Sequence, residues 1–136
     1  MLSIDVKVGR LLEIRLSAPT SLEELQQGMA SLGQLFRMRR DKLVGVGDFS
    51  HATVFSPDVA SKLLEALKFD NPRIERSGIL VSSSAIFGLQ LERLIVHAEN
   101  INRRAFHDPF ELKAFLGSLL THEEHMRMAQ FLNEQR

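Results

Sequence analysis

The residues that could carry chemistry in this chain are its serines, its carboxylates and five histidines, because cysteine is absent. The absence of cysteine excludes disulfides, thiolate catalysis and Cys-based zinc sites. His122 and His125 are three residues apart, so a helix would place both on one face. The zinc-protease signature needs histidines four residues apart with a glutamate after the first. We therefore interpret this segment as a solvated, charged helix face and predict no metal site.

A second group of polar residues lies in the stretch from Leu43 to Asp58, which reads LVGVGDFSHATVFSPD. Its apolar beginning predicts a short strand that ends near Asp48 and is followed by a loop. The end of the stretch, Ser-Pro-Asp, is typical of a helix N-cap and first turn. Small α/β proteins usually place function where a strand delivers a loop onto a helix N-terminus. The candidate partner-binding residues are therefore Asp48, Ser50, His51, Ser56 and Asp58.

These polar residues do not predict an active site. Ser50 and His51 are neighbours in the sequence, and their spacing from Asp48 implies no Ser-His-Asp geometry. Helix capping is sufficient to explain the Ser56 hydroxyl. We predict no catalytic residue and no cofactor, and we expect a protein that is not an enzyme.

Composition sets the remaining limits on function. A chain of 136 residues predicts one domain with a single hydrophobic core, spanning 1–136. Lysine and arginine total 17, as do aspartate and glutamate, and this balance disfavours nucleic acid as a partner. No apolar run reaches the length of a membrane span. The beginning, MLSIDVKVGR, lacks the pattern of a signal peptide, so we expect a cytoplasmic protein.

The hydrophobic pattern predicts alternating strands and helices. Residues 4–8 and 12–16 alternate between apolar and polar, which predicts a hairpin at a sheet edge. The predicted helices cover about 21–39, 57–70, 85–99 and 109–134, the last with a break or a new start at Thr121. Further strands are predicted at 43–48, 78–81 and 104–106. The order β-β-α-β-α-β-α-β-α predicts an α/β fold with a mixed sheet of about five strands and an antiparallel edge.

The helix predicted at 85–99 is apolar around much of its circumference. One face would pack on the sheet, and the remaining apolar surface would be available to a partner helix or to a second copy in a homodimer. Wider burial within the monomer explains the same pattern equally well. The helix predicted at 21–39 ends in a basic cluster of Arg37, Arg39, Arg40 and Lys42, which we interpret as a solvated helix end rather than a site for an acidic partner.

The element order and the stretch GDFSHATVFSPDV at 47–59 resemble the STAS fold of sulphate-transporter and anti-sigma-factor-antagonist domains. Asp48 and Ser50 match the Asp-apolar-Ser pattern at the end of that family's third strand. The stretch RAFHDPFELKAFL at 104–116 is similar to the ending of the broader SpoIIAA-like or STAS/SEC14-like group, with Phe115 where that group often has tryptophan. The resemblance implies a STAS-like sheet with its signalling corner at 48–58.

In the anti-sigma antagonists that this chain resembles, a partner kinase phosphorylates a serine at the helix start. Here Pro57 and Asp58 occupy the positions of the family's serines, and Asp58 could supply one permanent negative charge there. The first hypothesis is therefore a regulatory module that lacks this phosphoserine switch and binds a protein partner, such as a kinase-like or sigma-factor-regulating protein. The alternative is a small-ligand domain that binds a lipid-like molecule in a pocket between the second and third helices.

Overall fold

The structure is a computed structural model that describes residues 1–134. Its strands are β1 (Leu2–Asp5), β2 (Leu11–Ser17), β3 (Leu43–His51), β4 (Ile74–Val81) and β5 (Arg103–Phe106). Its helices are α1 (Leu22–Met38), α2 (Pro57–Asp70), α3 (Ala85–His97), α4 (Pro109–Gly117) and α5 (His122–Asn133), with a short 3₁₀ helix, η1 (Asn71–Arg73), between α2 and β4. The predicted order of strands and helices is confirmed.

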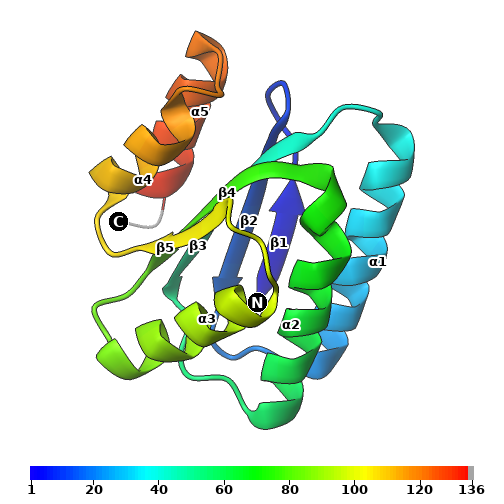
Figure 1. The fold of residues 1–136 in the computed structure, drawn as a ribbon, viewed down its shortest axis with the longest axis vertical. Coiled ribbons are helices and arrows are strands. Elements are labelled where there is room, and N and C mark those ends of the chain that lie inside the picture. The colour runs from blue at the N-terminus through cyan, green and yellow to red at the C-terminus, as the bar shows by residue number, and fades with distance from the viewer. Residues whose placement is uncertain (135–136) are drawn as a thin grey trace.

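The five strands form one sheet in the order β1-β2-β3-β4-β5, in which β1 and β2 are antiparallel and all other neighbours are parallel. This arrangement confirms the predicted mixed sheet with an antiparallel edge. Parallel strands need a crossover, and α1, α2 and α3 make the three crossovers here. Figure 1 shows α1 and α2 side by side next to the sheet, and α4 and α5 together away from them.

The hairpin between β1 and β2 depends on Gly9. Its φ angle is +56°, in the left-handed region that a residue with a side chain rarely adopts. The position is also crowded, because a Cβ atom would clash with the Glu124 carboxylate. That carboxylate, at the start of α5, accepts a hydrogen bond of 2.7 Å from the backbone N–H of Arg10. The hairpin turn and α5 are therefore joined across the end of the sheet.

Successive side chains of each strand point to opposite faces of the sheet, so the apolar residues form one layer on each face. One face of the sheet packs against α1, α2 and α3, and the other packs against α4 and α5. In β3, Val44 and Val46 belong to the layer under α4 and α5, whereas Phe49 belongs to the layer under α1, α2 and α3. Within residues 1–134, none of the helices combines the length and the hydrophobicity that a membrane crossing requires.

The helix starts follow their sequence signals. Ser21 and Glu24 form a reciprocal capping box at α1, and Thr121 with Glu124 forms another at α5. The second box starts a new helix after a short turn, so the segment predicted at 109–134 consists of two helices. At α4, the Asp108 side chain accepts a hydrogen bond from the backbone N–H of Phe110.

Four predicted boundaries were wrong. The first strand was predicted at 4–8, but β1 covers Leu2–Asp5 and therefore ends three residues earlier. β3 does not end near Asp48 but continues to His51, because the neighbouring strands keep pairing with it, from Phe49 with Val81 to His51 with Ser17. β4 begins at Ile74 rather than at Gly78, because β3 already pairs with its first residues, from Leu43 with Ile74 to Gly45 with Ser77. α3 ends at His97, two residues before the predicted end at Glu99.

Candidate functional site

Asp48 lies inside the protein, on the face of β3 turned toward α5, and its side chain is only 3% exposed. Its Oδ1 atom accepts two hydrogen bonds from Ser50, one from the backbone N–H at 3.0 Å and one from the hydroxyl at 2.5 Å. Its Oδ2 atom lies 3.6 Å from Nε of Arg15, a buried residue of β2. A partner therefore cannot reach Asp48 directly, and the carboxylate instead orders the end of β3.

Ser50 and His51 lie at this more accessible end of β3. Nδ1 of His51 is 3.4 Å from Oγ of Ser50, which donates its own proton to Asp48. In a hydrolytic triad the histidine stands between the serine and the carboxylate and removes the serine proton. Here the hydroxyl stands between the carboxylate and the histidine. The arrangement therefore holds the serine in place and does not activate it as a nucleophile.

A group of charged side chains, of which Glu13 and Arg15 are buried and Glu134 is about a third exposed, connects this strand end to α5. Arg15 pairs with Glu134 at 3.2 Å, and Arg127 pairs with Glu134 at 2.9 Å. Arg127 also donates two hydrogen bonds, of 2.8 and 2.7 Å, to the buried carboxylate of Glu13. Desolvation alone would raise the pKa of Glu134, but hydrogen bonds from Arg15 and Arg127 lower it. The position of Asp48 thus depends on the docking of α5.

Ser56 and Asp58 form a separate pair at the exposed N-terminus of α2. Ser56 occupies the N-cap position, but in the described part of the chain its hydroxyl accepts no capping hydrogen bond, so the capping explanation of this hydroxyl was wrong. The hydroxyl donates instead to Oδ1 of Asp58 at 2.7 Å. This bond, together with backbone N–H groups of the helix start, lowers the pKa of Asp58. A negative charge is therefore held at the helix N-terminus.

The five predicted partner-binding residues consequently form two clusters. Asp48, Ser50 and His51 lie on β3, while Ser56 and Asp58 lie at the start of α2. No hydrogen bond or ion pair within residues 1–134 joins the two clusters.

The loop between the clusters is fixed to α3. The side-chain amide of Gln90 donates to the carbonyl of Phe55 at 2.9 Å and accepts from the N–H of Phe55 at 2.8 Å. The Phe55 ring packs edge-on against Phe87, with the ring centroids 5.4 Å apart. These contacts hold the loop backbone and the outer side of α3 as one rigid unit.

A groove of about 510 Å³ lies along this unit. We call it the α3 groove, and its lining residues are Val54, Ile86, Leu89, Gln90, Arg93, Leu94 and His97. Several apolar side chains here face solvent: Val54 is 50% exposed, Ile86 71% and Leu89 55%. Val96, near the end of the same helix, is 74% exposed. The apolar surplus of α3 is thus surface and not core, and wider burial within the monomer is excluded.

Sequence reasoning missed two contributors to this site. Gln90 could have been recognised as the one uncharged polar residue in the otherwise apolar run from Ala85 to Leu91. Arg15 carried no comparable signal, because it sits at an apparently exposed position in an alternating strand. Only the packing of α5 over that face buries it.

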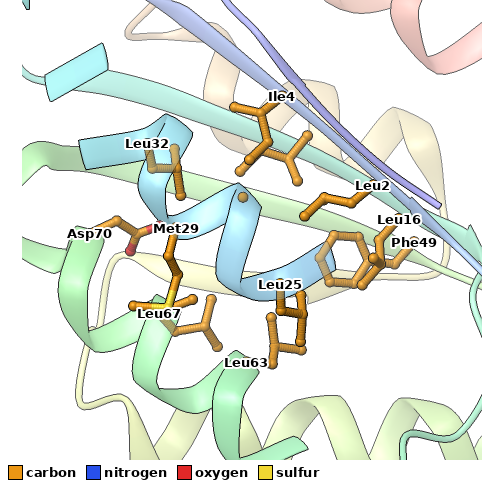
Figure 2. A pocket seen from close by; sticks show the side chains of 13 residues that line it. Leu2, Ile4, Leu16, Leu25, Met29, Leu32, Phe49, Leu63, Leu67 and Asp70 are labelled. Carbon is orange, nitrogen blue, oxygen red and sulfur yellow. The ribbon is translucent and has the colours of Figure 1, made fainter. Parts of the chain in front are cut away.

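The pocket predicted between the second and third helices is filled by Phe55 and Phe87. An apolar cavity instead lies between α1, α2 and the sheet, where Leu25, Leu63, Leu67 and Phe49 converge and Asp70 contributes one polar group (Figure 2). Its volume is about 50 Å³, far below the roughly 300–1,000 Å³ of typical ligand pockets. A lipid-like molecule does not fit this cavity. Within residues 1–134, no three His, Asp or Glu residues are placed to hold a metal ion.

No protein-family model and no curated protein matches the sequence. Among solved structures, the fold is similar to an uncharacterized protein of the DUF3478 family from Shewanella loihica PV-4, described as having a SpoIIAA-like fold. The TM-score is 0.64 at 13% sequence identity, over 85% of this chain and 92% of that one. At this identity the likeness concerns the fold alone. The chain therefore has a SpoIIAA-like α/β fold.

Proposed function

We propose that the protein is a non-catalytic interaction module that binds a protein partner at one corner, formed by residues 50–58 and the α3 groove. The observation that carries this proposal is the apolar rim of that groove, contributed by Val54, Ile86 and Leu89. Single exposed apolar residues are ordinary on protein surfaces, whereas a group of them beside a groove marks an interaction site.

Rigidity and charge support the same proposal. Because Gln90 and Phe87 already hold the loop, little conformational entropy would be lost when a partner binds it. Asp58 and Ser56 supply a polar rim next to the apolar groove, as is typical of protein interfaces. We therefore expect a partner that presents apolar side chains to the groove and a cationic group to Asp58.

The proposed surface is constant rather than switched by phosphorylation. Pro57 has no hydroxyl group, and Asp58 keeps its charge because its pKa is lowered by Ser56 and by the helix backbone. A kinase-like or sigma-factor-regulating protein is the partner class that the STAS resemblance suggests. The small-ligand alternative receives little support, since the apolar cavity is much smaller than a lipid chain.

We expect two substitutions on this corner, Val54→Asp and Asp58→Lys, to weaken partner binding at least about tenfold, a loss of about 1.4 kcal/mol. Proteins captured on the immobilised wild-type chain would be identified by mass spectrometry, purified and titrated by calorimetry. Met126→Asp is the matched control, because Met126 is at least as exposed as Val54 but lies on α5. A purified partner that binds both corner variants as tightly as wild type would contradict the proposal.

A second copy of the chain is another candidate occupant of the α3 groove, and would make the protein a homodimer. Four outward-facing residues of α3 are spaced three, four and three positions apart, which is the spacing found where two helices pack along each other. They are Ile86, Leu89, Arg93 and Val96. We expect light scattering at about millimolar concentration to give a dimer mass for wild type and a monomer mass for Leu89→Asp. A monomer mass for wild type would exclude the homodimer and leave the groove to a different protein.

A further inference from the structure

The edge of the sheet formed by β1 is open. Within residues 1–134 no strand lies beyond β1. Met1 and Ser17 form a hydrogen-bonded backbone pair. Along two antiparallel strands, hydrogen-bonded pairs alternate with non-hydrogen-bonded pairs, so the backbone N–H and C=O groups of Ser3 and Asp5 face β2. The backbone N–H and C=O groups of Leu2 and Ile4 therefore face away from the sheet. The Leu2 N–H is directed to the Glu24 carboxylate, which leaves Ile4 with both a donor and an acceptor at the edge.

A groove runs between this open edge and α1. One part, of about 200 Å³, is lined by Leu2, Ile4, Glu24, Gln27, Gly28 and Ser31. The next part, of about 490 Å³, is lined by Ile4, Asp5, Val6, Ser31, Gln34, Leu35, Met38 and Arg39. Because Ile4 and Ser31 line both parts, they form one channel, the β1–α1 groove. From Glu24 to Arg39 it follows about 22 Å of helix, roughly the length of six or seven extended residues.

We propose that the β1–α1 groove binds an extended peptide that adds a strand to the sheet beside β1. Strand addition uses main-chain hydrogen bonds for affinity and alternate side-chain pockets for specificity. Ile4 offers the main-chain groups, and half-buried Ile4, Val6 and Leu35 offer apolar contacts to every second side chain of the peptide. Across the groove, α1 presents small or neutral side chains, including Ser31 and Gln34, that leave room for the peptide.

The charges of the groove define the chemistry of the peptide. At the beginning of β1, the charge of Glu24 is offset by the N-terminal amine, 3.5 Å away. At the other end, Arg39 lines the groove and donates a hydrogen bond to the carbonyl of Gly9 at 2.9 Å, next to the exposed cations Arg37, Arg40 and Lys42. Asp41 pairs with Arg39 but is half exposed, so a competing carboxylate can replace it. Asp5 also lines this part of the groove, but alternation along β1 directs its side chain to the face opposite Ile4, so the cations at this end outnumber the carboxylates. The peptide therefore carries acidic residues at the end that lies beside Arg39.

The direction of the peptide follows from the same geometry. β1 runs from the Glu24 end of the groove toward the Arg39 end. Antiparallel pairing is the more stable arrangement per residue, and it places the N-terminus of the peptide beside Arg39. The proposed ligand is thus an extended segment with acidic residues first and alternating apolar residues after them. None of the residues that line this groove belongs to the proposed corner surface, so either proposal can fail without the other.

The test is fluorescence anisotropy with a labelled peptide of sequence DDVTVSV. We expect saturable binding that is at least about tenfold weaker for the charge-reversed peptide KKVTVSV, and that weakens as salt is added. Ser31→Arg places a long cation in the groove and is expected to abolish binding. Ala30→Arg adds the same side chain at an exposed neighbouring position outside the groove and is expected to leave binding unchanged.

N-methylation of the peptide provides a second test that does not depend on protein folding. Alternate residues of an added strand direct their N–H groups toward β1, so methylation at one set of positions should prevent binding and methylation at the other should not. The proposal is overturned if DDVTVSV shows no saturable binding up to about millimolar concentration. It is equally overturned if Ser31→Arg binds like wild type, if both methylated sets bind alike, or if DDVTVSV and KKVTVSV bind with the same affinity.

Discussion

Replacing Arg103 with alanine is expected to lower the free energy of unfolding at pH 7 by about 3–5 kcal/mol. Arg103 extends from β5 beneath the end of α2, where its Nη2 atom donates to Oδ1 of Asp70 at 2.5 Å. Its Nη1 atom donates to the carbonyl of Leu67 and to Oδ1 of Asn71, both at 3.1 Å. The side chains of the ion pair are only 1% and 7% exposed. Removing the cation leaves the buried Asp70 carboxylate unpaired and takes one donor from the Leu67 carbonyl and from Asn71 Oδ1, which keeps only its bond from Asn100.

This loss of stability should depend on pH in a defined direction. Burial raises the pKa of Asp70, while Arg103 opposes that increase. Without Arg103, the pKa of Asp70 in the native state rises further above its unfolded value, so the native variant binds a proton that the unfolded chain does not. The loss in free energy of unfolding caused by Arg103→Ala is therefore largest at pH values above this raised pKa of Asp70. It becomes smaller as the pH falls through that pKa.

Urea denaturation followed by far-UV circular dichroism measures these changes, since the chain has no tryptophan or tyrosine for fluorescence. Arg104→Ala is the matched control, because it removes the same kind of side chain at the neighbouring, exposed position of β5, and a loss of no more than about 1 kcal/mol is expected. A loss below about 1 kcal/mol for Arg103→Ala, or a loss that grows toward acidic pH, would contradict this description of the pair.

Replacing Arg15 with methionine is expected to lower the free energy of unfolding by about 3 kcal/mol and to loosen the end of β3. Arg15 donates to the carbonyl of Phe131 at 2.5 Å, and its guanidinium lies 4.1 Å from the centre of the Phe131 ring. Methionine keeps much of the apolar stem but leaves Asp48 buried without a cation. Because Asp48 holds Ser50, faster amide hydrogen exchange is expected at Ser50 and His51.

A double variant separates the loss of charge pairing from the loss of packing. Replacing both Arg15 and Asp48 with apolar residues, as Arg15→Met with Asp48→Leu, removes the uncompensated charge and should recover most of the stability. Glu134→Gln is the control, because this partner of Arg15 is about a third exposed and its removal should have a small effect. Equal losses for the single and double variants would show that the Arg15–Asp48 pairing contributes little.

The fold was predictable because each element has a local signal. The Ser21 and Thr121 capping boxes, the Asp108-Pro109 helix start and the alternation in 12–16 depend on neighbouring residues only. The extent of β3 was not predictable in this way. Residues Phe49 to His51 are strand because β2 and β4 pair with them, and a contact between distant segments leaves no local pattern.

The candidate site was predictable in position but not in geometry. The stretch 48–58 does lie at a strand end and a helix start, yet Asp48 is buried because α5, from the other end of the chain, brings Glu134 and Phe131 over Arg15. Likewise, whether Ile86, Leu89 and Val96 are core or surface depends on which side of α3 meets the sheet. An evenly apolar helix does not encode that choice.

The central claim is that the corner formed by residues 50–58 and the α3 groove is a docking surface for a protein partner. Amide hydrogen exchange of this chain with and without a saturating purified partner tests it most directly. We predict protection in peptides that cover 50–58 and 85–97, with exchange in α4 and α5 unchanged. Protection confined to other elements, with exchange at 50–58 and 85–97 unaffected, would contradict the claim.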